Sequence, residues 1–359
     1  MTSVKILFQG VFTCAILATL CLLSASCTIV EEGVESSNFD LVKLDKGVYA
    51  CIHKIGGKAI CNAGIVDLGD RTIIFDTFLS PLVAEEIPIL VEKLGLSPIK
   101  YVINSHYHND HVRGNQVFDE DVQIISTGKT AELIASEEPK AIAAEKNYAP
   151  QQLAYFDSLK RVFDGNTLSK EYEGILNYQP YFEAMVETSD ILETRIPDMI
   201  FDGEKVITGS KKEVKLISMG MGHSESDAVL YLPEEKILFA GDLVFKNMHP
   251  FMGESDPDGW ENILDNLAQL QPEIIIPGHG PVGSSEDIKT MKKYFYDTKK
   301  LVQDFIKDSL PSTELRDAVI PDPYVDWSFD NFFYSNLRFQ YNRLLKPVLQ
   351  DPGSGGKVF

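Results

Sequence analysis

The chain of 359 residues lacks the features of a nucleic-acid-binding protein. It has 33 Lys and Arg residues against 53 Asp and Glu residues, which gives a formal net charge of −20. It also has no basic cluster interleaved with aromatic residues. Affinity for a phosphate backbone comes largely from Lys and Arg contacts to phosphates. The composition therefore argues against a nuclease and against any nucleic-acid partner, whereas the acidic excess is typical of a solvated surface.

The motif of a serine hydrolase and low-complexity sequence are also missing. No G-x-S-x-G elbow is present to expose a catalytic serine at a strand–helix turn. No short-period repeat or biased tract interrupts the chain. The hydrophobic fraction of 44% supports a large core, and α/β architectures often reach this length as one unit.

The first 26 residues have the pattern of a signal peptide. A short, weakly basic segment precedes an apolar run, and Ser24-Ala25-Ser26 supplies the small residues of a cleavage site. Cys27 follows directly, which predicts a lipoprotein attached through Cys27, located in the periplasm or at the outer membrane of a bacterium. Ser24 departs from the usual lipobox, where Leu is common. Simple secretion and a retained membrane anchor are the alternatives, and residues 27–40 are interpreted as a linker.

Histidine is scarce, yet three of the seven histidines lie within six residues. The segment His106-Tyr107-His108-Asn109-Asp110-His111 follows a strand-like run at residues 99–104. Imidazole and carboxylate groups are the donors that suit zinc, cobalt, manganese or iron. This H-x-H-x-D-H pattern predicts a metal site.

Three distant residues complete the set of candidate ligands. In each case a short apolar run is followed by glycine and then by a side chain that can bind metal: His223, Asp242 and His279. Loops at the ends of buried strands are where open sheets collect functional groups. Glycine at such positions lets the backbone turn sharply and lets a metal approach closely.

These motifs, in this order, resemble those of the metallo-β-lactamase superfamily over roughly residues 45–285. The resemblance implies one zinc ion held by His106, His108 and His223, and a second held by Asp110, His111 and His279. It implies that Asp242 and a water or hydroxide bridge the two ions. Iron and manganese are the alternative metals.

The resemblance also implies the reaction. A hydroxide that bridges two metal ions near neutral pH is expected to attack the carbonyl of a small-molecule lactam, lactone, ester or thioester. Asp110 is the predicted catalytic residue, because it can orient the hydroxide or carry a proton. The alternatives are a class B β-lactamase proper, an iron-dependent enzyme like the sulfur dioxygenases, and a non-catalytic surface protein stabilised by metal. The commonest type of class B β-lactamase has Cys where this chain has Asp242. The oligomeric state is left open.

The fold implied by the resemblance is a four-layer αβ/βα sandwich of the α/β class. Its expected parts are a sandwich domain at residues 41–285, a helical insertion at 129–200, a helical C-terminal extension at 286–350 and a disordered tail at 351–359. A helix is predicted at residues 81–94, and Pro88 should kink or split it. Within the insertion, helices are predicted at residues 132–146 and 153–162. The aromatic residues of the insertion and of the extension either shape a pocket or contact, or form a core.

The remaining cysteines and histidines leave alternatives open. Cys51 and Cys61 flank Gly56-Gly57 between two strand-like runs. They would face each other across a hairpin with a three-residue loop and could form a disulfide, or they are two small buried hydrophobic side chains. His249 is predicted to line the pocket without binding metal, and His53 to face solvent or a hairpin neighbour.

Overall fold

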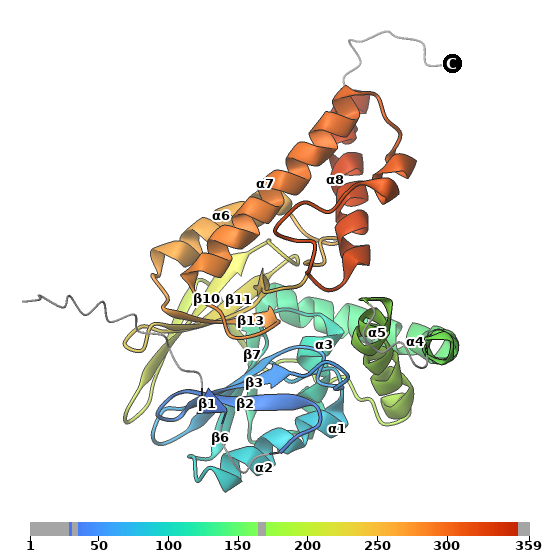
Figure 1. Cartoon of the computed structure of the whole chain (residues 1–359). Helices are drawn as coiled ribbons and strands as arrows, with labels where there is room; N and C mark the ends of the chain where they lie inside the picture. Colours follow the sequence, from blue (N-terminus) through green and yellow to red (C-terminus); the bar gives the residue numbers. More distant parts are fainter. Residues whose placement is uncertain (1–28, 31–34, 164–169, 351–359) are drawn as a thin grey trace, which may run out of the picture.

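The computed structural model describes residues 29–30, 35–163 and 170–350, and it shows two β-sheets packed face to face between helices (Figure 1). The first sheet has the strand order β1-β2-β3-β4-β5-β6-β7-β8 and the second has the order β13-β12-β11-β10-β9. Helices α1 and α2 cover the outer face of the first sheet, and α6 and α7 cover the outer face of the second. The predicted four-layer αβ/βα sandwich is confirmed.

The first sheet is antiparallel from β1 to β5 and parallel from β5 to β8. Its strands are β1 (Ile29–Val30), β2 (Phe39–Asp45), β3 (Val48–His53), β4 (Ala63–Asp67), β5 (Thr72–Phe75), β6 (Ile99–Ile103), β7 (Gln123–Thr127) and β8 (Met199–Phe201). The parallel strands bring their carboxyl ends to one edge of the sheet, where polar groups that follow each strand can meet. Part of the stretch predicted as a linker, residues 27–40, is strand, because β1 pairs with β2.

The second sheet is antiparallel except for the pair β12 and β13. Its strands are β9 (Glu204–Thr208), β10 (Glu213–Gly220), β11 (Asp227–Leu232), β12 (Ile237–Phe245) and β13 (Ile274–His279). The parallel pair is joined by α6 (Pro257–Gln269). Here too the ends of the two parallel strands lie at one edge of the sheet.

Alternation of apolar side chains explains why the layers stack. Successive residues of a strand point to opposite faces, so Ile74 packs under α1 and α2 whereas Ile73 and Phe75 face the second sheet. Across the sandwich, Phe239 on β12 belongs to that same central core. Each sheet is thus apolar on both faces, which requires a layer on either side.

The helix predicted at residues 81–94 is split in two. Helix α1 (Pro81–Ala84) ends just before Glu85, and α2 (Glu86–Lys93) contains Pro88 near its start. Proline cannot donate a backbone hydrogen bond, and its ring clashes with the carbonyl group four residues earlier. The residue four positions before Pro88 is Ala84, the last residue of α1, so Pro88 explains the position of the break.

The insertion between β7 and β8 consists of two long helices at the side of the sandwich, close to α3 (Asn109–Val112) (Figure 1). Helix α4 (Gly128–Val162) is continuous, although two separate helices were predicted within it. It contains both Pro139 and Pro150, so neither proline ends the helix, although proline usually kinks or breaks one. Helix α5 (Lys170–Thr188) was not predicted, because Gly174 and Pro180 obscure its pattern.

The C-terminal region is helical. Helix α7 (Ser285–Lys307) begins with a capping box, and the short helix η2 (Ser312–Asp317) leads to α8 (Asp330–Gln350). Between them, Tyr324 and Trp327 are buried against α7 together with Phe333. These three aromatic residues therefore form core. The tail predicted to be disordered, residues 351–359, lies outside the described residues.

Cys51 and Cys61 are both buried and free. Cys51 pairs across the strands with Ala63 rather than with Cys61, which precedes β4. The hairpin loop is longer than the three residues that would place the two cysteines opposite each other. The structure therefore agrees with the alternative of two small buried side chains. The Cys61 thiol donates a hydrogen bond of 2.8 Å to the backbone oxygen of Asp110.

Within the part of the chain that the structure describes, none of the helices is both long and apolar enough to cross a membrane. The predicted signal peptide and the candidate lipidation site Cys27 lie outside these residues.

Candidate metal centre

The structure brings all seven predicted metal ligands to one edge of the sandwich. They form two groups, His106, His108, His223 and Asp242 in one and Asp110, His111 and His279 in the other, each with ligand atoms within 4.8 Å of one another. Four come from the loop after β6 and from α3, and the others come from the β10–β11 loop, β12 and the end of β13. Their binding of metal stays a prediction.

In the first group, three imidazole nitrogens converge. His108 Nδ1 lies 3.0 Å from His106 Nε2 and 3.0 Å from His223 Nε2. Zn–N bonds of about 2.0–2.1 Å in a tetrahedron put ligand nitrogens roughly 3.4 Å apart. The spacing is close to that of three ligands around one zinc ion.

In the second group, two imidazoles face one carboxylate. Asp110 Oδ2 lies 3.6 Å from His111 Nε2 and 3.4 Å from His279 Nε2. These atoms belong to α3 and to the last residue of β13, so the site forms only when the two sheets pack together.

Asp242 joins the two groups through its two carboxylate oxygens. Oδ2 lies 3.2 Å from His223 Nε2, in the first group. Oδ1 lies 3.2 Å from His111 Nε2 and 3.3 Å from His279 Nε2, in the second. A carboxylate in this position can bind one cation with each oxygen.

Two buried atoms between the groups fit a metal ion better than a hydrogen bond. His111 Nε2 and Asp242 Oδ1 have no hydrogen-bond partner among the described residues, although they are close to each other. Buried polar groups in proteins are rarely left unsatisfied, and a metal ion is one explanation for those that are. The donors, five imidazoles and two carboxylates, are those that zinc and other first-row metals take. The residues present therefore fit a dinuclear metal centre.

Asp76, which sequence analysis missed, supports the segment at residues 105–111, the metal loop, through hydrogen bonds. It follows β5 directly and has a left-handed backbone, with φ +59°. Its Oδ2 accepts hydrogen bonds from His111 Nδ1 at 2.9 Å and from the Ser105 hydroxyl at 2.8 Å. With Nδ1 bonded to Asp76, the Nε2 of His111 is free to bind metal. The available signal was a carboxylate directly after an apolar run, although no glycine precedes Asp76 as Gly241 precedes Asp242.

The loop of His279 is anchored by a second missed residue, Asn62. Its side-chain amide donates to the backbone oxygens of Pro277 at 2.9 Å and Gly280 at 2.8 Å. His279 Nδ1 is 3.1 Å from the backbone oxygen of Ile60, which again leaves Nε2 facing the site. The segment before β4 thus fixes the end of β13 from across the sandwich.

Glycine is required at two positions beside Asp242. A Cβ at Gly278 would lie 1.9 Å from Asp242 Oδ1. Gly241 has φ +52°, and a Cβ there would lie 2.7 Å from the Cβ of Ser105. The glycines noted in the sequence before these ligands therefore allow close approach of the strands.

Burial and charge set the protonation of the centre. Burial lowers the pKa of His223 to about 3, so the imidazole is neutral, the form that binds metal. Burial alone would raise the pKa of Asp242, but the imidazoles of His279, His111 and His223 hold it well below its usual value. Asp242 is thus an anion.

The open side of the centre is marked by His108 and Asp110. Their side chains are 17% and 13% exposed, whereas those of His106, His111 and His223 are at most 1% exposed. At this side Glu254 lies 3.2 Å from His108 Nε2 and also accepts a hydrogen bond from the Tyr107 hydroxyl. A small molecule would therefore reach the centre past His108 and Asp110.

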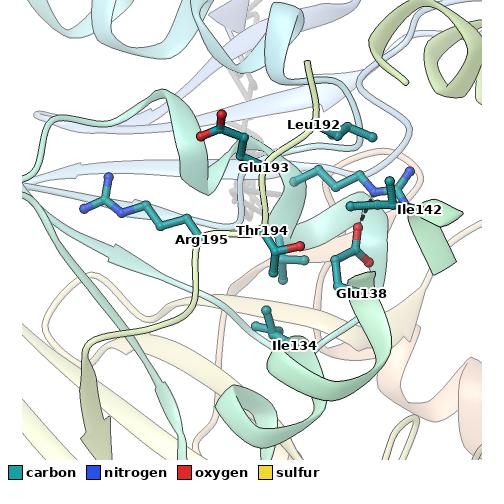
Figure 2. A pocket seen from close by; sticks show the side chains of 9 residues that line it. Ile134, Glu138, Ile142, Leu192, Glu193, Thr194 and Arg195 are labelled. Atoms are coloured by element: carbon teal, nitrogen blue, oxygen red, sulfur yellow. Dashed lines mark hydrogen bonds and ion pairs between the residues drawn. The ribbon is translucent and has the colours of Figure 1, made fainter. Parts of the chain in front are cut away.

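Behind the metal loop, Arg113 forms a buried ion cluster with α4. It pairs with Glu138 at 2.5 Å and Glu145 at 2.7 Å. Figure 2 shows the adjoining cavity between Glu138 on α4 and the segment at residues 192–195. Its volume of about 10 Å³ is enough for a single water. This cavity is therefore no substrate site, and its walls tie α4 to the metal loop.

The two histidines outside the set have other environments. His249 is fully buried among Tyr294, Trp327 and Phe333, so the prediction that it lines the pocket is wrong. Aromatic residues of α7 and of the C-terminal region surround it in the core. His53 accepts a hydrogen bond from the backbone of Ile60 on the neighbouring hairpin segment, as one of its two predicted environments requires.

Comparison with known proteins shows the family. The profile described as the metallo-beta-lactamase superfamily matches residues 56–279. A metallo-beta-lactamase type 2 of Bacteroides fragilis is 26% identical over 119 residues, 32% of this chain and 45% of its own length. A linear primary-alkylsulfatase of Pseudomonas sp. is 23% identical over 257 residues, 67% of this chain and 45% of its own length. The chain thus spans less than half the length of these two curated relatives.

Solved structures agree with the fold. TMB-1 matches with a TM-score of 0.51 and 17% identity, over 73% of this chain and 99% of that one. The metallo-beta-lactamase DIM-1 exposed to ceftazidime matches with a TM-score of 0.50 and 18% identity, over 74% of this chain and 99% of that one. At such identities the similarity concerns architecture.

Proposed function

Because the chain belongs to the metallo-β-lactamase superfamily, we propose that it is a metal-dependent hydrolase with two zinc ions per chain and a small-molecule substrate. The observation that carries the proposal is the position of Asp242, whose two oxygens lie 3.2 Å from His223 of one ligand group and 3.2 Å from His111 of the other. A hydrolase that used one ion would not need a carboxylate between two ligand sets.

The chemistry assigned to the metals is general. When bound, two zinc ions lower the pKa of a shared water towards neutrality and polarise the substrate oxygen. His106, His108 and His223 would hold one ion, and His111, His279 and Asp110 the other, with Asp242 between them.

Asp110 is the residue to which we assign proton transfer. Hydrolysis forms a bond between the carbonyl carbon and the water oxygen and breaks the bond from that carbon to nitrogen, oxygen or sulfur. One proton of the water must reach the leaving group. Asp110 is on the open side of the centre, and its Oδ2 is 3.4 Å from His279 Nε2, so its carboxylate is placed to hold that proton and release it.

The proposed substrate is a lactam, lactone, ester or thioester of low molecular weight. The β-lactamase relative supports a cyclic amide as one case. A second candidate is a sulfate ester, since the alkylsulfatase relative aligns with 67% of this chain, against 32% for that β-lactamase.

The test begins with metal content and a hydrolysis screen. Purified protein should contain two zinc ions per chain by mass spectrometry of the metals, and a chelator should abolish hydrolysis that zinc restores. The screen covers nitrocefin, a lactone, an acyl thioester, a p-nitrophenyl ester and an alkyl sulfate. Iron as the restoring metal, or no turnover of any substrate by zinc-loaded protein, would contradict the proposal.

Asp110→Asn separates proton transfer from ligation. We expect kcat to fall about 10²–10⁴-fold while at least one zinc ion per chain remains bound. Normal turnover by Asp110→Asn with both ions bound would remove the role assigned to this carboxylate.

We also propose that the protein is exported and attached to a membrane through Cys27. The support is the pattern of its first 27 residues. In cells, Cys27→Ser should move the protein from the membrane fraction to the soluble fraction. Unchanged membrane association would contradict the proposed attachment.

A further inference from the structure

An aromatic ring borders the candidate metal centre on its open side. Phe251, in the loop between β12 and α6, has its ring centroid 6.2 Å from that of His108 and 6.4 Å from that of His223. It is half-buried and belongs to none of the three core clusters. An apolar surface therefore begins beside two predicted ligands of the first metal.

Further rings continue this surface away from the centre. Phe251 lies 5.6 Å from Phe332 on α8, and Phe332 lies 5.4 Å from Phe329. Phe329 lies 4.6 Å from Tyr178 on α5. The surface thus crosses from the C-terminal extension to the insertion.

The series of ring contacts then returns towards the metal loop. Tyr178 stacks on Phe156 of α4 at 5.9 Å, and Phe156 stacks on Phe182 of α5 at 5.6 Å. Phe182 contacts Tyr181, whose hydroxyl is 3.0 Å from the amide nitrogen of Asn109, the residue before Asp110. We name the six rings from Phe251 to Phe182 the aromatic arc. The arc starts beside His108, and Tyr181 connects its other end to Asn109 in the metal loop.

The rings of the arc keep part of their surface exposed. All six are half-buried, in contrast to the fully buried Tyr324 and Phe333 of the C-terminal core. Phe156, Tyr178 and Phe182 share with Phe251 the property of lying outside the core clusters. Exposed apolar area that continues from a reactive centre gains free energy when an apolar ligand group covers it.

We propose that the aromatic arc binds an alkyl or aryl group of the substrate, so that the bond to be hydrolysed lies at the metal centre. The inference rests on the proposed hydrolase function and narrows its substrate class to molecules with an extended apolar part. The insertion and the C-terminal extension both contribute rings, so both would set specificity.

The experiment compares p-nitrophenyl acetate with p-nitrophenyl octanoate on zinc-loaded, full-length protein. If the arc binds the acyl chain, kcat/KM should rise by about fourfold for each methylene that the rings cover. Both esters share one leaving group, so the ratio of octanoate to acetate isolates the acyl chain. The ratio also cancels any difference in metal content or in the folded fraction between preparations.

Matched variants test which rings carry the effect. Phe251→Ser and Tyr178→Ser should each lower the octanoate-to-acetate ratio about tenfold, whereas Phe251→Leu and Tyr178→Leu, which keep an apolar surface, should retain most of it. Tyr296→Ser is the control, because Tyr296 is 65% exposed on α7 and lies outside the arc. It should leave the ratio unchanged.

The outcomes separate the two proposals. If wild-type protein hydrolyses both esters with equal kcat/KM, the hydrolase stands and the arc has no role in specificity. If neither ester nor any other substrate of the screen is hydrolysed, the hydrolase function fails. Binding of decanoate, measured by calorimetry, then decides on the arc. Weaker binding to Phe251→Ser and Tyr178→Ser than to Tyr296→Ser supports it, and equal binding overturns it.

Discussion

The metal centre and the aromatic arc meet at one edge of the molecule but are held by different forces. The centre is buried, and its side chains are fixed by hydrogen bonds, such as that of 2.9 Å between His111 and Asp76. The arc is half-buried, and its members contact one another through rings, such as Phe251 and Phe332 at 5.6 Å. Hydrogen bonds with defined geometry suit a catalytic centre, whereas apolar contacts can adapt to the shape of a ligand. If both proposals hold, the sandwich supplies the chemistry and the helices beside it set the specificity.

Removing Asp242 should have the largest effect, because it is shared by both ligand groups. We expect Asp242→Ala to lose both metals and to lower kcat/KM at least about 10⁴-fold. Metal analysis and the hydrolysis assay measure this directly. Asp265→Ala, at an exposed carboxylate on α6, is the control and should keep metals and activity. Retention of two metals by Asp242→Ala would show that the centre does not need the bridging carboxylate.

Arg113 joins the metal loop to α4, and its loss should lower the unfolding free energy strongly. Arg113→Met leaves the carboxylates of Glu138 and Glu145 buried without their cation. Breaking a buried ion pair from one side costs about 3–5 kcal/mol of unfolding free energy, which urea denaturation followed by circular dichroism would detect. Arg316→Met, at a side chain that is 81% exposed, should change stability by less than about 0.5 kcal/mol. Equal stability of the two variants would mean that α4 is held to the metal loop by other contacts.

Asp76 tests whether the hydrogen-bonded support of the centre matters as much as its ligands. Asp76→Asn keeps the size of the side chain but weakens the acceptor for His111 Nδ1. We expect the zinc affinity to fall about 10–100-fold, with wild-type turnover recovered at saturating zinc. Titration with a competing chelator measures the affinity. An unchanged affinity would mean that Asp76 contributes to the folding of the metal loop and not to metal binding.

The smallest effect concerns the thiols beneath the centre. Because Cys51 and Cys61 are free and buried, unfolded Cys51→Ala should show one reactive thiol fewer than the wild type in the absence of reductant. Had the two formed a disulfide, the variant would instead gain one. Thiol titration in denaturant shows whether the number of reactive thiols falls or rises.

The predictions from sequence succeeded where local pattern decides the structure. The strand that precedes the H-x-H-x-D-H segment and the break before Pro88 both depend on neighbours in the chain. They failed where a distant contact overrides the local rule. Helix α4 continues through Pro139 and Pro150. Its Glu138 and Glu145 form ion pairs with Arg113, which lies outside the insertion. His249 is buried by residues of the C-terminal region, about 45 to 85 positions further along the chain.

By itself the sequence determined the chemical inventory of this protein, since the types and spacing of its His and Asp residues predict a metal centre in any fold that brings them together. Only the tertiary structure decided which oxygen of Asp242 faces which ligand group, that Asp76 and Asn62 support the ligands, and that rings from α4, α5 and α8 line up beside the centre. The reason is physical. Donor chemistry belongs to a single residue, whereas distances of about 3 Å between residues more than a hundred positions apart exist only when both sheets are packed.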